Sequence, residues 1–181
     1  QAVVLTDKSP NVLVVYPSLP VTTVKELIAL ARAKPGELNY ARAAAGGPPH
    51  LSAELFRAMT GVNIAPIPYK GGGPAVIGLL GGQVQLALTS AISGMPHLKT
   101  GKLRGLAVTT LKRSPVISEF PTVAESGVPG YAVDGWYAVV LPAKTPPAIV
   151  NKLNKELVRL LETPGVIDAL AWPRLWRSLF L

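Results

Sequence analysis

The chain has no cysteine among its 181 residues, which excludes disulfide bonds and thiolate metal sites. Charged residues make up only 15% and hydrophobic residues 49%, so a packed core is expected rather than disorder. No apolar run reaches the ~20 residues that a membrane span needs, and no membrane insertion is expected. No signal peptide is recognisable from Gln1 onward, so any export signal is expected to have been removed or never to have been present.

Acidic residues are scarce and scattered, and no pair of carboxylates stands out for acid–base catalysis. The two histidines, His50 and His97, lie outside any metal-binding pattern, and structural roles are expected for both. No Gly-x-Ser-x-Gly motif supports a serine nucleophile. The sequence therefore predicts no catalytic residue, no metal and no cofactor, and argues against an enzyme.

The formal net charge of +8 raises the question of nucleic-acid binding. The basic residues are spread along the chain, apart from one locally basic segment that holds Lys99, Lys102, Arg104, Lys112 and Arg113. Because no aromatic side chains are interleaved there for base stacking, this segment is interpreted as a solvated face and no nucleic-acid partner is expected. A positive field could equally attract a small anion.

The stretch from Leu38 to Phe56 reads as a strand, a small-residue loop and a helix. The loop, 43–47, ends in two glycines, which let a ligand approach the backbone closely. Pro48 and Pro49 then suit a helix entry, whose free N–H groups can face an anion. Leu51, Leu55 and Phe56 are expected on one helix face, with Ser52 and Arg57 on another. The loop is interpreted as half of an anion-binding cleft, although a tight connector in an α/β sheet explains the same spacing.

A second loop repeats this arrangement after the apolar run 63–69, whose two prolines predict an edge or irregular strand. Lys70-Gly71-Gly72-Gly73-Pro74 lacks both the Gly-Lys-Ser/Thr ending of a P-loop and the Gly-x-Gly-x-x-Gly spacing, so nucleotide binding is not predicted. Thr89 and Ser90 end a further predicted strand, 83–88. Ligands bind at the carboxyl ends of strands in open α/β sheets, so the two loops predict a carboxylate site. The expected ligand-binding residues are Arg42, Ala43, Ala44, Ala45, Gly46, Gly47, Lys70, Gly71, Gly72, Thr89 and Ser90.

The rest of the chain alternates between apolar runs and amphipathic segments. The buried strand predicted at 11–16 is followed by a helix capped by Thr22 or Thr23. A short helix is predicted at 122–126, a strand within 131–141 and a strong amphipathic helix at 148–161. This order favours an α/β fold with a largely parallel sheet and helices on both faces.

Three long segments closely resemble the Bug-type periplasmic solute receptors, the substrate-binding proteins of tripartite tricarboxylate transporters. They begin at NVLVVYPSLP, GGPPHLSAELF and GKLRGLAVTT, and they include the specific motifs PYKG and FPTVAESGVPG. The resemblance covers roughly residues 3 to 166. It implies a periplasmic, two-lobed Venus-flytrap protein of the type II periplasmic-binding class. Such a protein captures small carboxylates and delivers them to membrane transporter subunits.

The resemblance also implies a domain plan. Residues 1–9 would be a stub of the first lobe, 10–132 the complete second lobe and 133–165 a partial return to the first lobe. Hinge strands are expected near Asn11 and near 134–136. The tail from Ile167 does not resemble the ending of the family, so 166–181 is treated as atypical. The family's opening segment, with glycine loops that hold the ligand from the opposite side, has no counterpart in this sequence.

The loop at 42–47 departs from the family in lacking Ser and Thr hydroxyls and in carrying Arg42. Arg42 is therefore expected to favour a ligand with an additional carboxylate. Three other readings remain open: a receptor remnant that no longer binds, the effector-sensing domain of a transcription regulator, and a small α/β enzyme. The regulator would need a helix-turn-helix, and no such segment is recognisable in the sequence.

Overall fold

The computed structural model describes residues 1–7, 10–114 and 117–169. The chain divides into two compact units: a central unit of residues 9–135, and an end unit of residues 1–8 together with 136–181. Each unit has its own sheet, with two hydrophobic clusters in the central unit and one in the end unit. Among the described residues, no helix combines the length and the apolar character that crossing a membrane requires.

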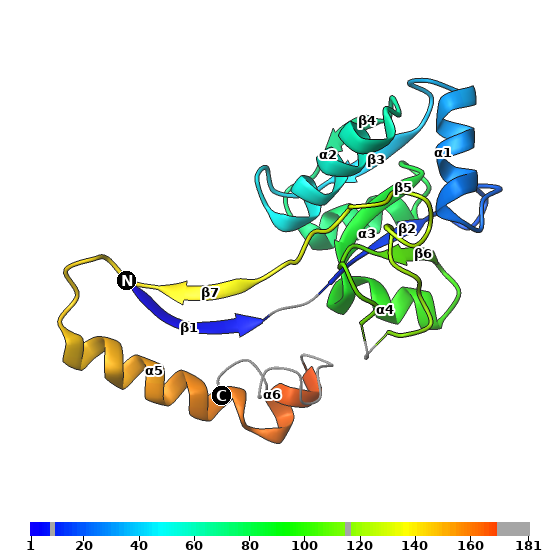
Figure 1. Cartoon of the computed structure of the whole chain (residues 1–181). Coiled ribbons are helices and arrows are strands. Elements are labelled where there is room, and N and C mark those ends of the chain that lie inside the picture. Colours follow the sequence, from blue (N-terminus) through cyan, green and yellow to red (C-terminus); the bar gives the residue numbers. More distant parts are fainter. Residues whose placement is uncertain (8–9, 115–116, 170–181) are drawn as a thin grey trace. The chain divides into compact units, whose positions relative to one another are not determined.

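The central unit alternates strands and helices along the chain (Figure 1). Its elements are β2 (Asn11–Val15), α1 (Val24–Ala33), β3 (Asn39–Arg42), α2 (Pro48–Thr60), β4 (Ala65–Pro68), α3 (Gly72–Leu80), β5 (Leu86–Ser90), α4 (Ala91–Lys99) and β6 (Arg104–Val108). This α/β architecture confirms the predicted fold class.

The strands of the central unit form one sheet in the order β4-β3-β5-β2-β6. β3 pairs in parallel with β4 and β5, whereas β2 runs antiparallel to both of its neighbours, β5 and β6. The prediction of a largely parallel sheet is therefore wrong for β2. All five residues of β2 are buried, and a strand buried on both faces has the same apolar composition in either direction.

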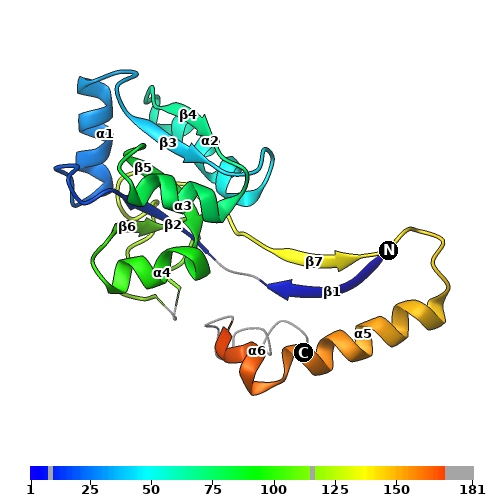
Figure 2. The ribbon, with the colours of Figure 1, turned by 180° about the vertical axis from the view of Figure 1, so that it is seen from behind.

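Helices cover both faces of this sheet, as predicted (Figures 1 and 2). On one face, α1 and α2 pack on side chains such as Leu13 and Tyr40, with Phe56 and Tyr131 in edge-to-face contact at 6.3 Å. On the other face, α3 and α4 pack on alternate strand residues such as Val12 and Ala41. This alternation follows from the two-residue period of a strand.

Several helix and strand ends follow from local sequence. Thr23 caps α1 in a reciprocal capping box with Glu26, which confirms one of the two predicted caps. β4 is an edge strand, and its two prolines explain this position because neither can donate to a ladder. α2 begins at Pro48, as the paired prolines predict, and ends at Thr60; Gly61 caps it in the left-handed conformation with a φ of 67°.

Two predicted elements differ from the structure. β5 begins at Leu86 rather than at Gln83, because Gln83 N–H closes a turn onto the Gly78 carbonyl oxygen. The helix predicted at 122–126 is only a turn. Its residue Val123 donates its N–H to Val108, and Gly127 then turns the chain at a φ of 110°.

The end unit contains β1 (Ala2–Asp7), β7 (Tyr137–Val140), α5 (Pro147–Leu161) and α6 (Pro164–Ala169). β1 and β7 pair antiparallel, and α5 packs on β1 through Val150, Val3 and Val4. The predicted strand within 131–141 is thus confined to β7, preceded by an isolated bridge between Pro10 and Asp134 in the central unit.

Candidate functional site

Three parallel strands of the central unit end at one edge of the sheet. Arg42 of β3 pairs with Pro68 of β4, and Ala41 pairs with Ala87 of β5. Tyr69 N–H donates to the Arg42 carbonyl oxygen over 2.9 Å, so β4 and β3 remain side by side to their last residues. The structure therefore brings together three groups of predicted site residues at this edge: loop 43–47, loop 70–72 and the pair Thr89 and Ser90. We call this edge, with these residues and Arg42, the loop edge.

The reversed direction of β2 adds residues to the loop edge that the sequence analysis did not select. Asn11 begins β2 and pairs with Ser90, at the end of β5. The Asn11 side chain is 2% exposed and donates from Nδ2 to the Ser52 hydroxyl over 3.0 Å. Thr109, which is fully buried, accepts from Asn11 N–H and donates to the carbonyl oxygen of Val133. In the sequence, the only indication that Asn11 has such a role is its position as an amide residue at the start of an otherwise apolar run.

The first loop contains a tight turn. Gly46 has a φ of 77°, which favours glycine, and Gly47 N–H reaches back to the Ala44 carbonyl oxygen over 3.3 Å. A Cβ at Gly46 would meet nothing within 4 Å, so the backbone angle and not crowding requires the glycine. Within the described residues, the N–H groups of Ala44 and Ala45 have no hydrogen-bond partner and are available to an anion.

Helix α2 offers fewer donors to the loop edge than predicted. No side chain caps its N-terminus, but its first two residues are Pro48 and Pro49, which have no N–H. Of the first-turn N–H groups that lack an intrahelical partner, only that of His50 remains. The paired prolines that help to start the helix therefore also reduce its capacity to bind an anion.

The second loop has the more open set of donors. Gly71 adopts a φ of 110°, and α3 begins at Gly72 with no side-chain cap. Gly72 and Gly73 are exposed first-turn residues that retain their N–H groups. Tyr69 sets the start of this loop: its hydroxyl donates to Gln83 over 3.1 Å, and its ring lies against Gly78.

Arg42 carries a cation that no described acidic residue neutralises. Its Nε is buried and has no hydrogen-bond partner among the described residues. The Nε of Arg57 is also buried without a partner, but the Arg57 guanidinium forms an ion pair with Glu54 at 2.8 Å. Arg104 donates to the carbonyl oxygens of Leu19 and Val21. A buried donor without an acceptor is unusual, and a ligand carboxylate is one acceptor that could supply the missing bond.

The hydroxyl groups at the end of β5 are already engaged or enclosed. Ser90 caps α4, accepting from Ser93 N–H over 3.3 Å and donating to the Ser93 hydroxyl over 3.0 Å. Thr89 is only 6% exposed, and its methyl carbon would lie 3.1 Å from a Cβ at Gly94. Lys70, by contrast, is exposed beside the second loop.

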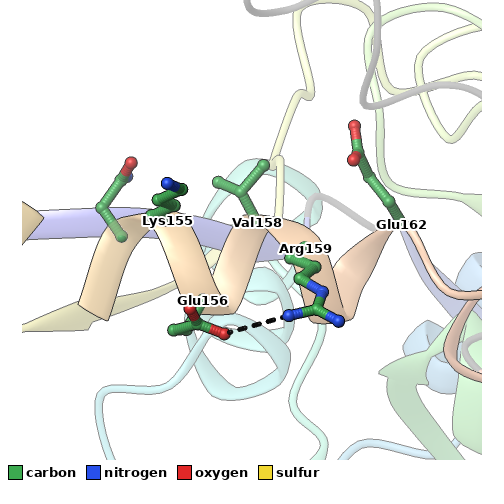
Figure 3. A pocket seen from close by; sticks show the side chains of 6 residues that line it. Lys155, Glu156, Val158, Arg159 and Glu162 are labelled. Atoms are coloured by element: carbon green, nitrogen blue, oxygen red, sulfur yellow. Dashed lines mark ion pairs between the residues drawn. The ribbon is translucent and has the colours of Figure 1, made fainter. Parts of the chain in front are cut away.

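The described residues contain no cluster of three or more His, Asp or Glu side chains that could hold a metal ion. A hollow on the end unit is lined, among the described residues, by five residues of α5 and by Glu162, which follows this helix (Figure 3). Two of its charged groups, those of Glu156 and Arg159, lie 3.9 Å apart. This hollow is a weaker candidate than the loop edge, because a single segment of the chain supplies its described lining and Glu156 and Arg159 form an ion pair with each other.

The mixed α/β sheet with loops at the carboxyl ends of its strands, joined to a second unit by two chain crossings, is similar to solved periplasmic binding proteins. One of them is BugD, which is 32% identical, with a TM-score of 0.88 over 94% of this chain and 57% of that one. Residues 1–173 match the family described as the tripartite tricarboxylate transporter family receptor, and the chain belongs to this family. The resemblance to Bug-type receptors is thereby confirmed.

Individual relatives agree with this assignment. The protein BugT of Bordetella pertussis is 40% identical over 162 residues, which are 90% of this chain and 50% of BugT. The structure of R. palustris Rpa4515 with adipate is 44% identical, with a TM-score of 0.87 over 94% of this chain and 57% of that one. MatC of Rhodopseudomonas palustris, with bound malate, is 29% identical, with a TM-score of 0.89 over 97% of this chain and 62% of that one. The chain spans about half the length of the curated relatives that it matches.

Proposed function

We propose that the chain is part of an extracytoplasmic receptor that captures a small carboxylate for a tripartite tricarboxylate-type transporter. The observation that carries this proposal is the loop edge, where unpaired backbone donors and the unpaired Nε of Arg42 lie at the ends of neighbouring strands. Backbone N–H groups and a guanidinium are donors that match the oxygens of a carboxylate.

In this proposal, the ligand contacts come from the residues predicted at the two loops and at the end of β5. Ala44, Ala45 and Gly72 contribute backbone N–H groups, and Lys70 contributes a flexible point charge. Ser90 and Thr89 contribute chiefly by shaping the site, because one caps α4 and the other is nearly enclosed. The protein is proposed to be a receptor and not an enzyme, because these groups offer hydrogen bonds and charge and because the family is one of receptors.

The proposed lobes follow the expected plan: residues 10–132 form the second lobe and residues 1–9 and 133–165 belong to the first lobe, while the tail 166–181 is assigned to no lobe in this proposal. The proposed location is the periplasm, and the proposed partners are the membrane subunits of the transporter. Membership of the receptor family supports all three proposals.

The relatives suggest the class of ligand. Rpa4515 was solved with adipate and MatC with malate, and both ligands are dicarboxylates. We infer that this chain also takes a dicarboxylate, with one carboxylate at the backbone donors and the other at Arg42. The lack of hydroxyls in loop 43–47 is consistent with recognition by backbone groups and charge.

Calorimetric titration of the purified protein with adipate, malate and hexanoate tests this proposal. Hexanoate matches adipate in length but has one carboxylate, so adipate or malate is expected to bind and hexanoate to bind much more weakly. Arg42→Ala removes charge-assisted hydrogen bonds of about 1.5–3 kcal/mol, and a tenfold to hundredfold weaker dicarboxylate affinity is expected.

Arg159→Ala is the matched control, because Arg159 is a surface arginine whose side chain is 82% exposed. The control is expected to bind like the parent protein. Equal affinity of Arg42→Ala and the parent would refute the role of Arg42. If the parent protein binds none of the three carboxylates while circular dichroism shows an intact fold, the receptor proposal is refuted and a remnant that no longer binds is favoured.

A further inference from the structure

A chain of polar contacts links the first loop to the sheet through His50. Gly46 N–H donates to His50 Nδ1 over 3.0 Å. His50 Nε2 lies 4.0 Å from Glu54 Oε1, one helical turn further along α2. Glu54 in turn accepts from the Tyr40 hydroxyl over 2.5 Å and from Arg57 over 2.8 Å. Loop, helix and strand are thus connected through one imidazole.

The acceptor role of Nδ1 defines the form of the imidazole. A ring nitrogen that accepts a hydrogen bond carries no proton, so the bond from Gly46 requires the neutral imidazole with its proton on Nε2, facing Glu54. The Tyr40 hydrogen bond and then the Arg57 hydrogen bond and charge lower the pKa of Glu54, which keeps this carboxylate ionised. A fixed negative charge beside Nε2 favours the tautomer that presents Nδ1 to the loop.

His50 is the principal side-chain anchor of loop 43–47. Among the described residues, no other side chain forms a hydrogen bond with this loop, and α2 has no side-chain cap. The loop's own turn bond, from Gly47 to Ala44, is long at 3.3 Å. The His50 side chain is only 19% exposed, so the packing that surrounds it restricts its orientation.

We propose that His50 is a positioning residue for ligand capture: in its neutral form it holds Gly46 and thereby orients the N–H groups of Ala44 and Ala45. Protonation of His50 turns Nδ1 into a donor, which faces the Gly46 N–H donor, and the bond is lost. The loop then loses its anchor. The part of this inference that concerns capture rests on the proposed function.

Charged groups on two elements bear on this protonation. On α2, Glu54 attracts an imidazolium and Arg57 repels it. On β3, the Tyr40 hydroxyl donates a hydrogen bond to the Glu54 carboxylate. The positive charge of Arg42 favours the ionised form of Tyr40 and so opposes the rise in the pKa of this hydroxyl. None of these groups supplies an acceptor to Nδ1. A protonated His50 can therefore keep its contact with Glu54, but it loses the hydrogen bond from Gly46 N–H.

Nuclear magnetic resonance of the ¹⁵N-labelled protein tests the anchor without any ligand. At neutral pH, the Nδ1 resonance of His50 is expected to be that of an unprotonated nitrogen. When the pH is lowered, the Gly46 amide shift is expected to change in step with the ring resonances of His50. A protonated Nδ1 at neutral pH, or a Gly46 amide that does not follow His50, would overturn the inference.

Three substitutions at His50 separate anchoring from simple packing. His50→Asn places an oxygen near the position of Nδ1, whereas His50→Gln places its amide near Nε2 and His50→Ala supplies neither. Gly46 amide exchange is expected to accelerate about threefold to tenfold in His50→Ala and His50→Gln, and to stay near the parent rate in His50→Asn. His97→Asn, a change at the other histidine, is the matched control. Equal Gly46 exchange in all three His50 variants would refute the anchor.

Adipate titration of the same variants tests the link to capture. His50→Ala is expected to bind adipate several-fold more weakly at neutral pH, with His50→Asn restoring much of the affinity. Adipate affinity of the parent is expected to fall at acidic pH, and that of His50→Asn to fall less. If the exchange results hold but His50→Ala binds adipate like the parent, the positioning role is wrong. If the parent binds no carboxylate, the proposed function fails, while the exchange results still decide whether His50 anchors the loop.

Discussion

Ser52 provides the most direct test of how α2 is held at the loop edge. Its side chain lies in a helix position that is fully buried, although the sequence pattern predicted the polar face. The hydroxyl donates to the Pro48 carbonyl oxygen over 2.7 Å and accepts from Asn11 Nδ2 over 3.0 Å. Ser52→Ala removes both hydrogen bonds and leaves the shape of the core almost unchanged.

The two losses differ in cost. Without the Ser52 hydroxyl, the Pro48 carbonyl oxygen can still accept the helical N–H four residues later, so the loss of this hydrogen bond costs little. Asn11 is 2% exposed, so its Nδ2 group is left buried without a partner, which costs about 1–3 kcal/mol. The better helix propensity of alanine offsets about 0.5 kcal/mol. The net expectation is a loss of about 0.5–2.5 kcal/mol in the free energy of unfolding.

Urea unfolding followed by circular dichroism measures this loss, and a thermal scan should show a fall of about 2–4 °C per kcal/mol. Ser18→Ala, at an exposed serine, is the control and is expected to change stability by less than about 0.5 kcal/mol. In a double-mutant cycle, Asn11→Ala and Ser52→Ala should be less costly together than the sum of the single changes. An unchanged stability of Ser52→Ala, or strict additivity in the cycle, would refute the reasoning.

Two further changes test neighbouring features. Gly78→Ala would place a Cβ 2.3 Å from the Tyr69 hydroxyl oxygen, so the Tyr69 ring must move. We therefore expect lower stability and a displaced Lys70–Gly72 loop, measured as altered amide chemical shifts in this loop. Unchanged amide shifts would contradict this packing. The Tyr40 hydrogen bond and Arg57 lower the pKa of Glu54, so its stabilising contribution is present above its unfolded-state pKa and is lost as pH falls through its folded-state pKa. Glu54→Gln should therefore destabilise the protein at neutral pH and lose less stability on acidification than the parent, as measured by urea unfolding at several pH values. Parallel pH profiles would argue against this role.

Much of the central unit could be predicted because its signals are local. The capping box at Thr23, the prolines in β4 and the glycine that ends α2 each act within a few residues. The two glycine loops were predicted for the same reason, since φ values above zero at Gly46 and Gly71 favour residues without a side chain.

Strand direction and side-chain partners could not be predicted in this way. The apolar run of β2 does not encode its antiparallel direction, yet that direction brings Asn11 to the ends of β5 and β6. Ser52 is buried only because Asn11 and Tyr131 approach it from segments distant in the sequence, donating to its hydroxyl and its carbonyl oxygen. His50 looked like an isolated histidine until the positions of Gly46 and Glu54 were known.

The sequence by itself determined the fold class, the family and the chemical character of the two loops, because backbone conformation and hydrophobic period depend on neighbouring residues. Only the tertiary structure decided which groups meet at the loop edge. It also showed that Pro48 and Pro49 reduce the donors of α2, that Ser90 is used as a cap and that the Nε of Arg42 is left without a partner. The physical reason is that hydrogen bonding and burial depend on distances between segments, and sheet order and strand direction set those distances.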